Sequence, residues 1–235
     1  MFAKILRTTL FALLFASSAV LAEKPWTLDD NLRYMSMGDS LAAGKGATPV
    51  TRGYAYLLYQ DQVFGKIDDV TFANAAVPGV TSEQVLMWQV PAAIQVFKPD
   101  VITMSVGGND LERILVEQLD PIVVLGEFAA NMGQILCGLR AALPDAVIIV
   151  GNQYDIPNLS ADIPAVRDVI IAANGLLADV AQTCGTKVAD VFSALDGRHG
   201  LLLGERKGAL DPYEIHPTDA GYRVMAKAFK EAAKQ

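Results

Sequence analysis

The chain has 235 residues, of which 52% are hydrophobic, and it carries a formal net charge of −7 at neutral pH. A chain of this length and composition can bury the core of one globular domain. Its acidic balance excludes the basic surface with which proteins bind nucleic acid or anionic lipid.

The first 22 residues have the composition of a secretory signal peptide. Lys4 and Arg7 form a basic start, residues 9–22 are apolar, and Ala22 closes a stretch of small residues suited to cleavage. The apolar run is shorter than the ~20 residues that a membrane-spanning helix needs, and no later segment is expected to span a membrane. We therefore predict a secreted or periplasmic protein. Its mature chain, residues 23–235, would be one domain with a formal net charge of −9, because the leader takes two positive charges with it.

Short apolar segments alternate with longer segments of helical periodicity. Strands are predicted over residues 32–37, 70–75, 100–106, 146–151 and 186–191. Helices are predicted over residues 53–64, 81–97, 121–143, 163–184 and 217–234, with Pro91 breaking or kinking the second. This alternation predicts an α/β fold with a doubly wound, parallel, five-stranded sheet and helices on both faces. Sites in such sheets form at the carboxyl ends of the strands.

Two cysteines, Cys137 and Cys184, each lie late in a predicted helix. Export would permit a disulfide between them, and two buried free thiols are the alternative. Neither cysteine has a spacing typical of metal ligands or of a CxxC motif, so no metal is expected.

Glycines and small polar residues follow the predicted strands. Ser40 stands in Gly-Asp-Ser-Leu after the first strand, Gly79 lies in the turn after the second, and Asn109 stands in Gly-Gly-Asn-Asp after the third. A serine becomes a nucleophile when a base takes its proton and fixed donors hold the resulting oxyanion. His216, just before the last helix, suits the base, whereas His199 has the surroundings of an ordinary loop histidine. The backbone N–H groups of Ser40 and Gly79 and the side-chain amide of Asn109 would form the oxyanion hole.

These four residues, in this order, resemble the four sequence blocks of the SGNH (GDSL) hydrolase family. The resemblance covers nearly all of the predicted mature chain. It implies a flavodoxin-like single domain and a carboxylic-ester hydrolase of the esterase, lipase, lysophospholipase or thioesterase type. Such an enzyme acts through an acyl-serine without a cofactor, and its partner is a small-molecule or lipid ester.

One block departs from the family pattern. The acid that orients the histidine usually stands three residues before it, but here that residue is Tyr213. Asp211 is favoured for this role, because Pro212 fixes a turn that would return the Asp211 carboxylate to the imidazole. Glu214, two residues before His216, and a backbone carbonyl are the alternatives.

Competing interpretations of the serine motif fit less well. Residues 38–45 approach a phosphate-binding P-loop but have one residue too many between the glycines, and Gly46 stands where Ser or Thr belongs. Gly38-x-Ser40-x-Ala42 approaches the α/β-hydrolase elbow, which normally follows several strands rather than the first. Two other functions stay open: a carbohydrate O-acetyl esterase or acetyltransferase, and a binding module that has lost turnover.

Residues next to the four blocks carry further expectations. Asp39 and Asp110 are expected to fix their loops through hydrogen bonds. Leu86, Met87 and Trp88 follow the Gly79 turn and are candidates either for an acyl pocket or for the core. No long insertion has the features of a lid, which predicts a preference for short to medium soluble esters.

Overall fold

The computed structural model describes residues 31–235, and the predicted signal peptide, residues 1–22, lies outside the described residues. Its strands form one sheet in the order β2-β1-β3-β4-β5. Every pairing in the sheet is parallel, which confirms the predicted doubly wound α/β architecture. The strands are β1 (Leu32–Gly38), β2 (Val70–Asn74), β3 (Val101–Ser105), β4 (Val147–Gly151) and β5 (Lys187–Ala189).

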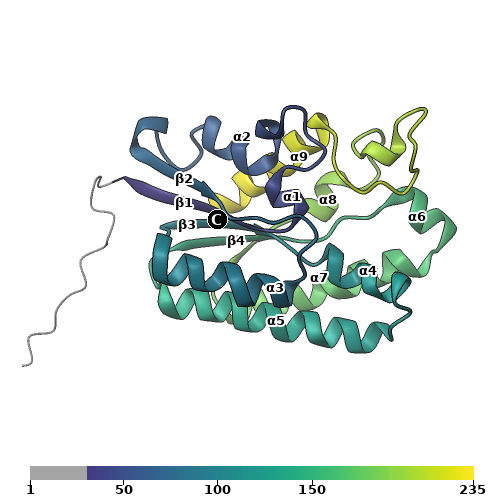
Figure 1. Cartoon of the computed structure of the whole chain (residues 1–235), viewed down its shortest axis with the longest axis horizontal. Helices are drawn as coiled ribbons and strands as arrows, with labels where there is room; N and C mark the ends of the chain where they lie inside the picture. The colour runs from purple at the N-terminus through teal and green to yellow at the C-terminus, as the bar shows by residue number, and fades with distance from the viewer. Residues whose placement is uncertain (1–30) are drawn as a thin grey trace, which may run out of the picture.

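Helices connect the strands and cover both faces of the sheet (Figure 1). The α-helices are α1 (Ser40–Ala43), α2 (Tyr54–Gln60), α3 (Ser82–Gln84), α4 (Gly108–Val116), α5 (Pro121–Ala142), α6 (Pro157–Asp162), α7 (Ala165–Thr183), α8 (Val191–Leu195) and α9 (Asp219–Ala233). Short 3₁₀ turns are η1 (Val50–Arg52), η2 (Ile67–Asp69) and η5 (Leu203–Glu205), and π-helical segments are η3 (Val85–Gln89) and η4 (Ala92–Phe97).

Successive strand residues point to opposite faces and so supply two cores. Tyr34 and Ile149 belong to the core beneath α2, α8 and α9, whereas their neighbours Met35 and Ile148 belong to the core beneath α5 and α7. Figure 1 shows α2 and α9 on one side of the sheet and α3, α5 and α7 on the other. Because both faces of the sheet are buried, the strand sequences are mostly apolar runs rather than regular alternations of apolar and polar residues.

The second predicted helix continues through Pro91 instead of breaking there. Pro91 keeps a helical φ of −59°, and the wider turns of η3 and η4 lie on either side of it. Proline has no N–H to donate to the preceding turn, and π-helical turns absorb this loss. The wide turns bury Gln89 beside the end of β1, where it is 4% exposed.

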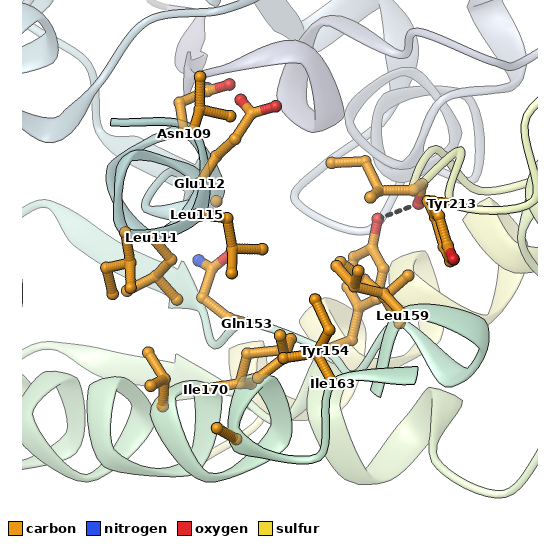
Figure 2. Close-up of a pocket in the computed structure, with 18 of the residues that line it drawn as sticks. Asn109, Leu111, Glu112, Leu115, Gln153, Tyr154, Leu159, Ile163, Ile170 and Tyr213 are labelled. Atoms are coloured by element: carbon orange, nitrogen blue, oxygen red, sulfur yellow. Dashed lines mark hydrogen bonds between the residues drawn. The ribbon is translucent and has the colours of Figure 1, made fainter. Parts of the chain in front are cut away.

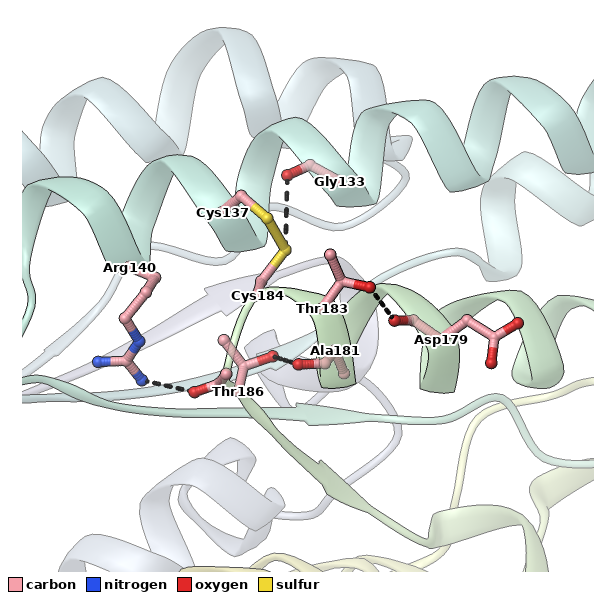
Figure 3. Close-up of a disulfide and its surroundings, with 9 residues drawn as sticks. Gly133, Cys137, Arg140, Asp179, Ala181, Thr183, Cys184 and Thr186 are labelled. Carbon is pink, nitrogen blue, oxygen red and sulfur yellow. Dashed lines mark hydrogen bonds between the residues drawn. A yellow bond between two sulfur atoms is a disulfide. The ribbon is translucent and has the colours of Figure 1, made fainter.

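The disulfide favoured from the sequence is present (Figure 3). It joins Cys137 in α5 to Cys184 at the C-terminal cap of α7, with a Cα–Cα distance of 4.7 Å. These two long helices lie side by side on one face of the sheet. The bridge therefore fixes neighbouring helices to each other.

Helix α5 is long and apolar enough by composition to cross a membrane. Here it covers the sheet, with Val124, Phe128, Met132 and Leu136 buried against it. The core helix of a globular domain passes the same test of length and hydropathy as a membrane span. Packing against the sheet accounts for the apolar residues on the buried face of this segment, whereas Ile122 and Val123 at its start are exposed.

Candidate active site

Ser40 lies in the sharp turn between β1 and α1. Gly38 has a φ of +118°, and a Cβ on it would lie 1.9 Å from the Ser105 carbonyl oxygen, so only glycine fits there. Asp39 caps α1 by accepting a hydrogen bond from the Leu41 N–H at 2.9 Å, as expected of a loop-fixing residue. The turn thus holds Ser40, 6% exposed, at the carboxyl end of a central strand.

Two side-chain amides brace this turn. The Gln89 side chain accepts from the Gly38 N–H at 2.6 Å and donates to the Gly38 carbonyl at 2.9 Å. From β2, the Asn74 amide donates to the Ala42 carbonyl at 2.9 Å. Gln89 was missed from the sequence, because its burial depends on the π-helical turns rather than on regular helical spacing.

His216 reaches Ser40 from the opposite end of the chain. Its Nε2 lies 2.8 Å from Ser40 Oγ, and its Nδ1 is hydrogen-bonded to the Glu214 carboxylate. A carboxylate accepts but does not donate, so Nδ1 carries the proton and Nε2 accepts from the Ser40 hydroxyl. Ser40, His216 and Glu214 therefore form one hydrogen-bonded line.

Glu214, and not the favoured Asp211, faces the imidazole. The Asp211 carboxylate instead accepts from the Tyr213 N–H at 2.8 Å and is exposed. Aspartate commonly accepts a hydrogen bond from the backbone N–H two residues further on. The Asp211 carboxylate is therefore engaged within the turn at Pro212 and does not reach the His216 imidazole as predicted. The Glu214 Oε1 atom also accepts from the His216 backbone N–H at 3.1 Å.

Burial and the hydrogen bond act in opposite directions on the imidazole. Burial lowers the pKa of His216 below its usual value, although the Glu214 carboxylate opposes this shift. For Glu214, partial burial raises the pKa, but hydrogen bonds from the His216 side chain and backbone outweigh burial and lower it. The pair is therefore a neutral imidazole beside an ionised carboxylate at neutral pH.

The Gly79 turn and the start of α4 are fastened together. Asn109 donates from its side-chain amide to the Val80 carbonyl at 2.8 Å. Asp110 accepts from the Ser82 N–H at 2.9 Å and from the Ser82 hydroxyl at 2.6 Å, which is the loop-fixing role expected of it. Gly79 has a φ of +86°, with open space where a Cβ would stand.

The Ser40 backbone and Asn109 lie together in one pocket. Because Ser40 is the first residue of α1, its N–H has no acceptor within the helix. Asp39 lines the same pocket, and burial raises its pKa to about 7.

A pocket of about 350 Å³ extends from Ser40 and Asn109 between α4 on one side and α6 and α7 on the other (Figure 2). Aliphatic side chains dominate its lining: Leu111, Ile114, Leu115, Val116, Ile156, Leu159, Ile163, Val166, Val169 and Ile170. A concave apolar pocket with a few polar groups at one end is typical of a small-molecule site. This one suits a hydrocarbon chain.

The residues suggested for an acyl pocket from the sequence do not line it. Met87 and Trp88 are exposed on η3, and Leu86 packs partly against the core. The walls come from α4, α6 and the start of α7, and of these only α7 lies within a helix predicted from the sequence.

The second histidine, His199, lies outside the pocket that contains Ser40. The His199 side chain is 88% exposed and lies 3.4 Å from a Glu205 carboxylate oxygen, as befits a loop histidine. Within residues 31–235, no group of three His, Cys, Asp or Glu side chains is placed to hold a metal ion.

A serine hydroxyl bonded to an imidazole, at the carboxyl end of a parallel sheet, defines a serine hydrolase of the α/β class. More specifically, residues 36–224 match the model of the GDSL-like lipase/acylhydrolase family, and the chain belongs to that family. It is a serine ester hydrolase. A comparison with curated proteins found no match.

Solved structures share the fold. The lipase Lip_vut3 from a goat rumen metagenome is 22% identical, with a TM-score of 0.65 over 86% of this chain and 97% of that one. The W215I form of Axe2, an acetyl xylan esterase from Geobacillus stearothermophilus, is 20% identical, with a TM-score of 0.67 over 87% and 95% of the two chains. A structure named TesA is 23% identical, with a TM-score of 0.64 over 86% and 98%. At these identities the likeness establishes the fold alone.

Proposed function

We propose that the protein hydrolyses carboxylic esters with an aliphatic acyl group, with Ser40 as nucleophile and His216 as general base. The observation that carries this proposal is the hydrogen-bonded line from Ser40 through His216 to Glu214 at the end of an aliphatic pocket. An acyl chain in the pocket would bring its carbonyl carbon to Ser40 Oγ.

The reaction follows from the hydrogen bonds. His216 Nε2 takes the hydroxyl proton as Ser40 Oγ bonds to the acyl carbon, and Glu214 stabilises the imidazolium that forms. His216 then gives the proton to the departing alcohol oxygen, which leaves an acyl-serine. His216 next removes a proton from water as the water oxygen bonds to the acyl carbon, and it returns that proton to Ser40 Oγ as the bond between Oγ and the acyl carbon breaks and the carboxylic acid leaves.

The tetrahedral oxyanion would be held by the predicted donors, the N–H groups of Ser40 and Gly79 and the side-chain amide of Asn109. Each fixed donor of this kind is worth about 10²–10³ in rate. Asn109 donates one amide hydrogen to the Val80 carbonyl, and its second amide hydrogen would serve the oxyanion.

The size and lining of the pocket indicate which acyl groups the enzyme would accept. Its volume lies near the lower end of the ~300–1,000 Å³ range for small-molecule sites, and its walls are mainly aliphatic. We therefore expect medium-length acyl chains to be preferred over acetyl groups and over very long chains. Sugar esters fit less well, because these walls offer few partners for hydroxyl groups.

The test is hydrolysis of p-nitrophenyl esters from acetate through palmitate by the mature protein, Ser40→Ala and the exposed control Ser193→Ala. We expect the best kcat/KM between hexanoate and decanoate, and a loss of about 10⁴-fold or more in Ser40→Ala alone. Activity of Ser40→Ala within tenfold of the parent would contradict the nucleophile. A folded parent inactive on the whole series would instead favour a sugar-ester enzyme or a binding module.

Export to the periplasm or beyond is part of the same proposal. It is supported by the leader-like composition of residues 1–22 and by the disulfide between Cys137 and Cys184, which persists in oxidising compartments. Fractionation of cells that express the full chain, with mass spectrometry of the mature N-terminus, tests it. A cytoplasmic product that retains Met1 would be the contrary result.

A further inference from the structure

Exposed apolar side chains gather around the mouth of the acyl pocket. Of the fourteen exposed large hydrophobic residues in the described chain, we group seven that either line the pocket or stand within two residues of a lining residue in the sequence, and we call them the apolar rim: Leu115, Val116, Ile122, Val123, Ile163, Leu210 and Tyr213. Ile122 is 80% exposed, Val116 is 73% exposed and Leu210 is fully exposed. Contiguous exposed apolar surface of this kind marks an interaction site.

The rim is continuous with the pocket. It is built by the end of α4, the start of α5, the α6–α7 junction and the loop before His216, which meet at the carboxyl end of the sheet (Figure 1). Leu115, Val116, Ile163 and Tyr213 are both exposed and part of the pocket lining. An apolar path therefore leads from solvent to Ser40.

The segments that build the apolar rim also carry acidic residues. These are Glu112, Glu117, Asp120, Asp162 and Asp211. Arg113 pairs with Glu117 at 3.5 Å and with Glu127 at 3.0 Å, which leaves Glu112, Asp120, Asp162 and Asp211 against Arg206 and Lys207 in these segments. An anionic surface would be repelled by this excess of carboxylates, whereas a neutral or zwitterionic surface would not.

We propose that the apolar rim docks on the neutral surface of an aggregate of amphiphilic esters, such as a micelle or a zwitterionic bilayer. This rests on the proposed function and revises the expectation of soluble substrates. Contact with the aggregate would bury the rim and let an acyl chain pass into the pocket without crossing water. A second copy of the chain seated on the rim would close the pocket instead.

Binding can be tested without turnover in the Ser40→Ala protein. We expect it to sediment with phosphatidylcholine vesicles and to bind phosphatidylglycerol vesicles more weakly. Adding Ile122→Ser and Val123→Ser, which do not line the pocket, should lower the partition coefficient about tenfold or more. Leu210→Ser should also lower it, because it removes another part of the rim. Ile67→Ser with Val96→Ser, a matched pair of exposed residues just before β2 and β3 at the other end of the sheet, should leave it unchanged.

With Ser40 restored, the rim variant should keep the parent kcat/KM on monomeric p-nitrophenyl butyrate and lose activity on emulsified esters. The proposal is overturned if the Ser40→Ala protein does not bind phosphatidylcholine, if rim and control variants bind equally, or if anionic vesicles bind better. It is also overturned if sedimentation velocity shows a dimer that the rim substitutions dissociate. Failure of the proposed function would show separately, as ester hydrolysis that survives Ser40→Ala.

Discussion

At the scale of single residues, the catalytic geometry depends on which carboxylate orients His216. Glu214 bonds the imidazole, whereas Asp211 closes its own turn. We expect Glu214→Ala to lower kcat about 10³-fold, because the imidazole loses both its orientation and the charge that stabilises it when protonated. Asp211→Ala should change kcat by only about twofold. Purified variants assayed with one p-nitrophenyl ester decide the matter, and the reverse order of effects would restore Asp211 as the acid.

The pH dependence of the reaction also belongs to one residue. Burial lowers the pKa of His216, so the neutral base is present at neutral pH and is lost as pH falls through that lowered pKa. We expect kcat/KM to be flat near pH 7 and to fall on an acid limb below the usual histidine pKa of about 6.5. Glu214→Gln removes the charge that opposes the shift, so its limb should move to still lower pH. An acid limb centred above pH 7 in the parent would contradict this assignment.

At the scale of elements, the loop after β4 and helix α6 hold the segment before His216 in place. The Tyr154 hydroxyl donates to the Ile215 carbonyl at 2.6 Å, and the Asn158 amide donates to the Pro212 carbonyl at 2.8 Å. The Tyr213 hydroxyl bonds Asp162 at the end of α6. The position of His216 thus depends on the packing of two elements as well as on its own loop.

This dependence predicts the effect of deleting one oxygen atom. Tyr154→Phe keeps the ring but leaves the Ile215 carbonyl without its partner, at a cost of about 1 kcal/mol. We expect kcat to fall about fivefold with KM nearly unchanged, because the loss misaligns His216 while the aromatic ring, which lines the acyl pocket, stays in place. Tyr213→Phe removes the exposed hydrogen bond to Asp162 and should lower kcat less than Tyr154→Phe does, because an exposed hydrogen bond contributes less than a buried one. A rise in KM with constant kcat would show that Tyr154 acts on substrate binding instead.

The elements that the sequence predicted are those with clear periodicity. The five strands and long helices such as α5 and α7 are apolar runs bounded by turn residues, and they stand within a few residues of their predicted bounds. Helices α1, α4 and α6 have nine residues or fewer and were not predicted, yet α1 follows the nucleophile turn, and α4 and α6 form pocket walls together with the start of α7. The pairing of Ser40 with His216 was visible as motifs. The choice of Glu214 was not, because it depends on how Asp211 closes its turn.

At the scale of the whole molecule, reactive and stabilising features occupy opposite ends of the sheet. Helix α5 begins beside the pocket at Pro121 and runs to Cys137, which lies more than four turns away and is bridged to the end of α7. The disulfide therefore fastens the two helices far from Ser40. The pocket between α4, α6 and the start of α7 is shaped by noncovalent contacts alone.

This separation predicts that the disulfide contributes to stability and not to catalysis. The bridge spans a sequence separation of 47 residues, so its loss should lower the free energy of unfolding by about 2–4 kcal/mol, chiefly by freeing the unfolded chain. We expect Cys137→Ala with Cys184→Ala to shift the urea midpoint downward while kcat/KM at 25 °C stays within about twofold of the parent. Reduction of the parent should give the same two results. The contrary result would be a double variant with an unchanged urea midpoint and a lowered kcat/KM. It would mean that the disulfide acts on the native state, by holding α5 and α7 in the geometry that shapes the pocket, rather than on the unfolded chain.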